Sequence, residues 1–123
     1  MQTSRVIYFE IPATRPEDCM KFYQQVFGWQ FSQLNDEAYW LTKTGSDELP
    51  GINGAIKPGS KAQPSVINTI QVTHLERTIL AIEQYGGQLV SAKQLLPGIG
   101  KLVYFKDPDG NVHGALQTDG TAK

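Results

Sequence analysis

The chain has 123 residues, of which 40% are apolar and 19% charged, and this suits one globular domain over residues 1–123 with a modest core. Its formal net charge of -1 argues against broad electrostatic attraction to nucleic acid or to an acidic membrane surface. The sole cysteine excludes an intrachain disulfide, no apolar run approaches the ~20 residues of a membrane helix, and no targeting pattern begins the chain, so we expect a cytoplasmic protein.

The first half of the chain predicts a strand, a helix and three further strands. Residues 6–11 have high β-propensity, and we expect this strand to end at Pro12, which cannot donate to a ladder. Apolar side chains at helical spacing predict a helix that begins near Pro16 and ends at Gly28. The segments that follow are a hairpin of residues 29–34 and 38–43, a glycine-interrupted strand over residues 52–56, and a linker over residues 57–65.

The second half repeats this order. Residues 66–72 predict a strand, residues 75–85 a helix that stops at two glycines, and residues 89–92 a further extended segment. Residues 102–105 and 112–116 predict a hairpin at the end of the second half, around an Asp-Pro-Asp-Gly turn. The repeat favours two tandem βαβββ modules, about 5–57 and 65–117, and two bare sheet faces brought together would form an apolar-walled groove.

The whole pattern resembles the vicinal oxygen chelate superfamily, which includes glyoxalase I, the bleomycin-resistance proteins and the extradiol dioxygenases, and most of all its small glyoxalase-like proteins. The resemblance rests on YFEIPATRPEDCMKFYQQVFGW, GINGAI, the second helix with its GG stop, and YFKDPDGNVHGALQ. It implies an α+β fold in which two βαβββ modules form a cupped, incompletely closed eight-stranded sheet. It also implies a homodimer.

The resemblance also says where a divalent metal would be held in the metalloenzymes of this family. Their ligands come from the first and last strands of the modules, and these positions fall on Tyr8, on or near Ile67, on Gly114, and within residues 52–56, where Asn53 is the polar side chain. Isoleucine and glycine carry no donor atom, and asparagine is a poor ligand for Zn²⁺, Ni²⁺ or Fe²⁺. We therefore predict no metal and no other cofactor.

Four polar residues share the strand face that the metal ligands use in relatives: Tyr8, Glu10, Thr69 and Gln71. They either orient a ligand or form a satisfied structural network, and Glu10 is the one credible proton acceptor. Trp40 and Tyr104 either line the groove or pack under a helix, and Asn53 either lines it or holds the bend of its strand. His113 falls on the opposite face of its strand, either as a packed, hydrogen-bonded residue or as a ligand or base.

Three functional hypotheses follow. The first is a metal-free protein that binds a small, partly apolar organic molecule through Tyr8, Glu10, Trp40, Asn53, Thr69, Gln71, Tyr104 and Gly114. The second is a lyase, isomerase or dioxygenase of the same superfamily with an atypical or absent metal site, in which Tyr8, Glu10, Gln71 or His113 replaces the usual ligands or Glu10 transfers a proton. The third is a non-catalytic subunit whose cup is filled by its own side chains.

Overall fold

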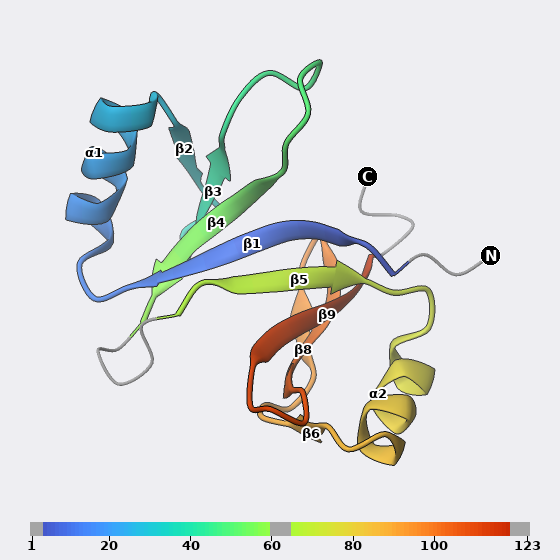
Figure 1. Cartoon of the computed structure of the whole chain (residues 1–123). Helices are drawn as coiled ribbons and strands as arrows, with labels where there is room; N and C mark the ends of the chain where they lie inside the picture. Colours follow the sequence, from blue (N-terminus) through green and yellow to red (C-terminus); the bar gives the residue numbers. More distant parts are fainter. Residues whose placement is uncertain (1–3, 60–64, 119–123) are drawn as a thin grey trace. The chain divides into compact units, whose positions relative to one another are not determined.

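A computed structural model describes residues 4–59 and 65–118, and these residues divide into two compact units (Figure 1). The first unit spans Tyr8–Ile67, and the second holds the described residues that precede and follow it. Each unit has one helix and its own set of paired strands. The predicted α+β class is confirmed, and in each unit a strand precedes the helix and further strands follow it.

The first unit pairs its strands in the order β2-β3-β4-β1, with β1 parallel to β4 and the other pairs antiparallel. Helix α1 lies on one side of these strands (Figure 1). The elements are β1 (Val6–Ala13), α1 (Pro16–Phe27), β2 (Gln30–Gln33), β3 (Trp40–Lys43) and β4 (Asn53–Pro58).

Both ends of α1 follow from the local sequence. Pro16 takes the first helical position, and Glu17 and Asp18 place negative charge in the first turn. Gly28 ends the helix at a φ of 76°, a left-handed conformation that glycine adopts without strain, and its N–H donates 2.9 Å to the Gln24 carbonyl. The predicted helix is confirmed at both ends.

Two strands in this unit extend beyond their predicted C-terminal ends. Strand β1 runs through Pro12, where it is expected to stop, to Ala13, and β4 runs through Lys57 and Pro58, which the sequence predicts as part of a linker. The two extensions pair with each other, Pro12 with Lys57 and Ala13 with Pro58. A proline lacks the N–H that would bond to one neighbour, but it can still pair on its other side. Residues 60–64 of the predicted linker lie outside the described residues.

The second unit pairs its strands in the order β5-β9-β8-β6, with β5 parallel to β9. Strand β7 also pairs with β8, so the described part of this unit has one strand more than the predicted module. The elements are β5 (Ile67–Gln71), α2 (Leu75–Gln84), β6 (Gln88–Leu89), β7 (Gln94–Leu96), β8 (Gly100–Lys106) and β9 (Val112–Thr118).

The additional strand arises because the predicted extended segment 89–92 is interrupted. Val90 N–H donates to the Tyr104 carbonyl, and the Ser91 hydroxyl accepts from the Tyr104 N–H at 3.1 Å. A side-chain oxygen thus replaces a backbone carbonyl opposite β8, and regular pairing resumes only at Gln94.

The core of the second unit lies between α2 and the sheet face that meets it. Val72, Leu75, Val103 and Ala115 are buried there, with Ile70, Ile79, Leu89 and Phe105 packed around them. The first unit instead stacks Tyr23 of α1 on Trp29 at 4.7 Å between ring centroids. No helix among residues 4–59 and 65–118 is long and apolar enough to cross a membrane.

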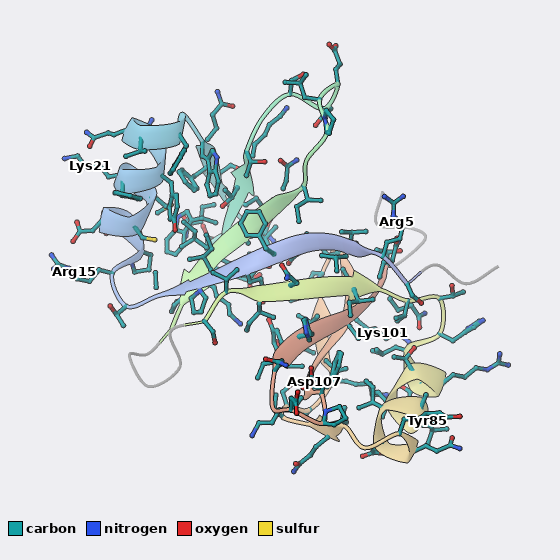
Figure 2. All side chains as sticks on the ribbon, viewed as in Figure 1. Arg5, Arg15, Lys21, Tyr85, Lys101 and Asp107 are labelled. Atoms are coloured by element: carbon teal, nitrogen blue, oxygen red, sulfur yellow. The ribbon has the colours of Figure 1, made fainter. Side chains whose placement is uncertain are left out.

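The β8–β9 hairpin forms as its turn sequence predicts. The carboxylate of Asp107 accepts from the N–H groups of Asp109 and Asn111, each at 2.9 Å, and Gly110 has a φ of 89°. The side-chain amide of Asn111 also donates to the Asp107 carboxylate at 2.9 Å, and this hydrogen bond is the largest cause of the lowered pKa of the Asp107 carboxyl, followed by the one from the Asn111 N–H. Figure 2 shows Asp107 at this turn, at the end of the unit where α2 finishes.

Candidate functional site

The strand face that carries Tyr8 and Glu10 is the one turned away from α1. Phe9, which lies between them, contacts Trp29 at 5.9 Å between centroids, and Trp29 stacks on the α1 residue Tyr23. Because strand side chains alternate, Tyr8 and Glu10 project from the other face. Register places Ala55 and Leu41 beside Glu10 on that face, so its surroundings are apolar.

Four side chains of this unit form a connected polar cluster. Tyr39 donates a hydrogen bond of 2.6 Å to Oε2 of Glu10, and the hydroxyls of Tyr8 and Tyr39 are hydrogen-bonded to each other. Tyr8 also lies 3.4 Å from the same carboxylate oxygen. The ammonium of Lys57 is 3.3 Å from the other oxygen, Oε1. We call Tyr8, Glu10, Tyr39 and Lys57 the tyrosine–glutamate cluster.

Burial differs sharply across this cluster. Glu10 is only 1% exposed, and the Lys57 side chain is 22% exposed. A buried carboxylate is costly unless it is paired and hydrogen-bonded, and Glu10 has both kinds of partner. Tyr8 and Tyr39 are half-buried, so each phenol reaches from the buried carboxylate toward the surface of the unit.

Both phenols stay protonated well above neutral pH. Burial is the largest cause of the raised pKa of Tyr8, and the negative charge of Glu10 is the second. The same two causes, in the same order, raise the pKa of Tyr39. Tyrosinate would place a second negative charge beside the Glu10 carboxylate. The two side chains therefore act as neutral hydrogen-bonding groups.

Sequence reasoning missed Tyr39 and Lys57. Tyr39 precedes Trp40 by one residue, and alternation in that hairpin could have placed it on the face opposite Trp40, but its partner Glu10 is 29 residues away. Pro58 and Gly59, which follow Lys57, instead favour a linker at this point of the sequence. Its place opposite Pro12 depends on the register of two strands that are far apart in the sequence.

Two predicted site residues of the first unit are not part of the tyrosine–glutamate cluster. Trp40 pairs with Ile56, and Ile56 pairs with Ile11. Ile11 and Phe9 share one face of β1, so Trp40 lies on the face that α1 covers. Asn53 pairs with Tyr8 in register, but its side-chain oxygen accepts from the Thr44 N–H at 3.0 Å. Asn53 thereby holds the loop that connects β3 to β4.

The second unit brings three predicted residues together. Gly114 of β9 pairs with Thr69 on one side and with Tyr104 on the other, and all three are buried. Because Ala115 and Val103 face α2, these three residues lie on the face away from it. Gln71 lies two residues along the same face of β5 and donates to the Thr118 hydroxyl at 3.2 Å.

The two histidines occupy places unrelated to these polar groups. His113 pairs with Phe105, on the α2 side of the sheet, and its Nδ1 is buried with no hydrogen-bond partner among the described residues. It is packed, as one of the two interpretations predicted, but that nitrogen is not hydrogen-bonded. His74 precedes α2, and its carbonyl accepts from the Thr78 N–H at 3.0 Å.

The side chains at the family's metal positions do not suit a divalent ion. Tyr8 is a neutral phenol that is hydrogen-bonded to Tyr39, and Ile67 has no donor atom. A Cβ atom at Gly114 would lie 3.2 Å from both Leu102 Cδ1 and Thr69 Oγ1, so any side chain at this position would be in tight contact with both residues. Within residues 4–59 and 65–118, no group of three or more His, Cys, Asp or Glu side chains gathers.

A separate cleft of about 500 Å³ opens between α1 and β2. Phe31 of β2 is part of its lining and lies on the α1 side of the sheet, because it pairs with Thr42, which pairs with Gly54 opposite Phe9. The cleft therefore lies on the opposite side of the sheet from the tyrosine–glutamate cluster. Its other lining residues are Glu17, Met20, Lys21, Gln24 and Gln25.

The known proteins that are similar to this chain include glyoxalase-like proteins. No protein-family profile matches the chain. It is 30% identical over 123 residues to a glyoxylase-like domain-containing protein of Didymella fabae, covering 90% of this chain and 91% of that protein. It is 24% identical over 119 residues to the putative glyoxylase CFP32 of Mycobacterium bovis, covering 94% of this chain and 45% of that protein, so it spans about half of that relative.

Among solved structures, the chain is similar to a glyoxalase/bleomycin resistance protein/dioxygenase superfamily member from Vibrio splendidus 12B01. The TM-score is 0.63 at 17% identity, and the match covers 95% of this chain and 100% of that one. At this identity the likeness shows a shared fold.

Proposed function

Because this chain belongs to the glyoxalase-like proteins of the vicinal oxygen chelate superfamily, we propose that it binds a small, partly apolar organic molecule against the Tyr8 and Glu10 face of β1. We further propose that it does so without a metal ion. The candidates Thr69, Gln71, Tyr104 and Gly114 lie in the second unit, and their part in binding stays a prediction from the sequence.

The observation that carries the proposal is the tyrosine–glutamate cluster itself. Small-molecule sites are mostly apolar and contain a few polar groups that are held in place before the ligand arrives. The Tyr8 hydroxyl fits this description, because its hydrogen bonds with Tyr39 and Glu10 hold it in place. The apolar residues Leu41 and Ala55 lie on the same face of the sheet as Tyr8. Burial of the Glu10 carboxylate costs free energy even with the partly exposed Lys57 ammonium beside it, and a binding role would explain that arrangement.

The metal-free part of the proposal rests on the donor groups. Tyr8 is a neutral phenol, Glu10 is bonded to Tyr39 and Lys57, and the position of the last-strand glutamate is Gly114. Elemental analysis of protein purified without chelators and without an affinity tag tests this part. We expect no stoichiometric transition metal, and one metal ion per chain would contradict it.

The enzymatic alternative uses Glu10 as a general base. Glu10 is only 1% exposed and contacts Tyr39 and Lys57, so a substrate could reach its carboxylate only if a neighbouring side chain moved. A hydrogen-bonded structural role for Glu10 needs no such step. Binding is therefore the better supported of the two.

A thermal-shift screen of small aromatic and carbonyl compounds tests the binding proposal. A ligand that prefers the folded state raises Tm, and we expect Tyr8→Phe to reduce that rise. Tyr85→Phe is the matched control, because Tyr85 is 76% exposed at the end of α2 (Figure 2). Equal responses of the two variants would argue against a role for Tyr8.

The homodimer and the cytoplasmic location expected from the sequence are also part of the proposal. Sedimentation equilibrium of the full chain tests the first, with a mass of twice 13.6 kDa as the expected result.

A further inference from the structure

We propose that the bound molecule presents an O–H or N–H group to Tyr8, so that the site selects hydrogen-bond donors over molecules that carry only acceptors. This inference rests on the proposed function and specifies the chemistry of its ligand. It follows from counting the protons of the tyrosine–glutamate cluster.

The count begins at the buried end of the cluster. The Glu10 carboxylate is paired with the Lys57 ammonium at 3.3 Å, and an ionised carboxylate can only accept hydrogen bonds. Tyr39 has one hydroxyl proton, and it donates that proton to Glu10 Oε2 at 2.6 Å. In its hydrogen bond with Tyr8, the Tyr39 oxygen must therefore be the acceptor.

Tyr8 is then the donor to Tyr39, and its one proton is used inside the cluster. The second geometry that the structure permits has the same result, because Tyr8 would then donate to Glu10 Oε2 across 3.4 Å. In both cases the Tyr8 oxygen keeps acceptor capacity and no free proton. For Tyr8 to donate to a ligand, a bond within the cluster would have to be given up.

This polarity should be visible as a preference between two otherwise matched molecules. 1-Phenylethanol and acetophenone differ in that the alcohol has an O–H donor and the ketone has only an acceptor. One hydrogen bond at a partly buried site corresponds to roughly a tenfold difference in Kd. We expect wild-type protein to bind the alcohol about tenfold more tightly than the ketone in a ligand-observed NMR titration.

An isosteric variant should reverse the donor and acceptor roles in the hydrogen bonds between residue 10, Tyr39 and Tyr8. In Glu10→Gln the amide nitrogen can donate to Tyr39, Tyr39 can donate to Tyr8, and the Tyr8 proton becomes free for a ligand. In this variant we expect the ratio of the ketone Kd to the alcohol Kd to fall from about ten to about one or below. Should Glu10→Gln fold poorly, Tyr8→Phe provides the second test, with the preference reduced to near unity.

The outcomes separate the inference from the function on which it rests. Wild-type protein that binds the ketone as tightly as the alcohol overturns the inference and leaves ligand binding intact. An alcohol preference that survives in Tyr8→Phe also overturns it, because the preference would then arise elsewhere. No binding of either probe at millimolar concentration contradicts the inference and the proposed function together.

Discussion

Tyr39 donates a hydrogen bond of 2.6 Å to the buried carboxylate of Glu10, and so ties the β2–β3 hairpin to strand β1 across 29 residues of sequence. The bond has two roles in the molecule as described. It satisfies one oxygen of a carboxylate that is 1% exposed, and it orders the protons of the tyrosine–glutamate cluster. The first predictions concern this bond and its neighbours.

Tyr39→Phe should lower the free energy of unfolding by roughly 1.5–3 kcal/mol, the range for hydrogen bonds to charged groups. The ring keeps its packing, so the loss reports the hydroxyl. Urea denaturation measures the change. Tyr85→Phe removes a hydroxyl from an exposed ring and should alter stability by no more than about 0.5 kcal/mol. A similar small effect at Tyr39 would mean that this bond adds little.

The Glu10–Lys57 pair should show a larger coupling than an exposed pair. Lys57→Met leaves the Glu10 charge without this ammonium, whereas adding Glu10→Gln removes the charge as well. A double-mutant cycle should give a coupling of roughly 1–3 kcal/mol. The exposed Arg15–Asp18 pair is the control, and we expect less than about 1 kcal/mol there. Equal coupling energies would contradict the structural distinction.

Stability should fall in alkaline solution because of Tyr8 and Tyr39. Folding raises both pKa values above the ordinary 10.0, so above about pH 10 the unfolded chain loses protons that the folded chain keeps. Each tyrosine then lowers the free energy of unfolding by up to about 1.4 kcal/mol per pH unit as pH rises, and contributes no pH dependence below that range. Urea denaturation of wild type and of the Tyr8→Phe/Tyr39→Phe double variant tests this, and the variant should have the shallower slope. Identical slopes would exclude these two residues as the cause.

Gly54→Ala should be strongly destabilising. A Cβ atom at Gly54 would lie 2.4 Å from the Phe9 carbonyl oxygen and 2.6 Å from its ring, so β1 and β4 would have to separate locally. Overpacking of this kind costs about 1–3 kcal/mol, measured by thermal or urea denaturation. Gly45→Ala is the matched control, since a Cβ there meets nothing within 4 Å. If both variants were equally stable, that result would contradict the close contact between Phe9 and Gly54.

Thr69→Val should stabilise the second unit by up to about 1 kcal/mol. The Thr69 hydroxyl is buried with no hydrogen-bond partner among the described residues, so replacing it with a methyl group removes a desolvated polar atom. Thr42→Val should instead destabilise by about 1 kcal/mol, because the buried Thr42 hydroxyl donates to the Trp40 carbonyl at 3.2 Å. A loss of stability at Thr69 would show that its hydroxyl is satisfied in solution.

The elements predicted correctly from sequence are those whose causes are local. Gly28 ends α1, and the Asp107 carboxylate organises its own turn with partners no more than four residues away. The errors occur where a distant partner decides. Ser91 breaks a predicted strand because Tyr104 lies opposite it, and β1 continues through Pro12 because β4 pairs with it there.

The sequence by itself determined the α+β class, the two helices, the family resemblance and the strand face on which Tyr8 and Glu10 lie. Only the tertiary structure decided that Tyr39 and Lys57 join them, that Trp40 lies on the other face, and that the Gly114 position is already enclosed by Thr69 and Leu102. The physical reason is that alternation and turn chemistry act over a few residues. Strand register and the pairing of buried charges act between segments that the sequence keeps far apart.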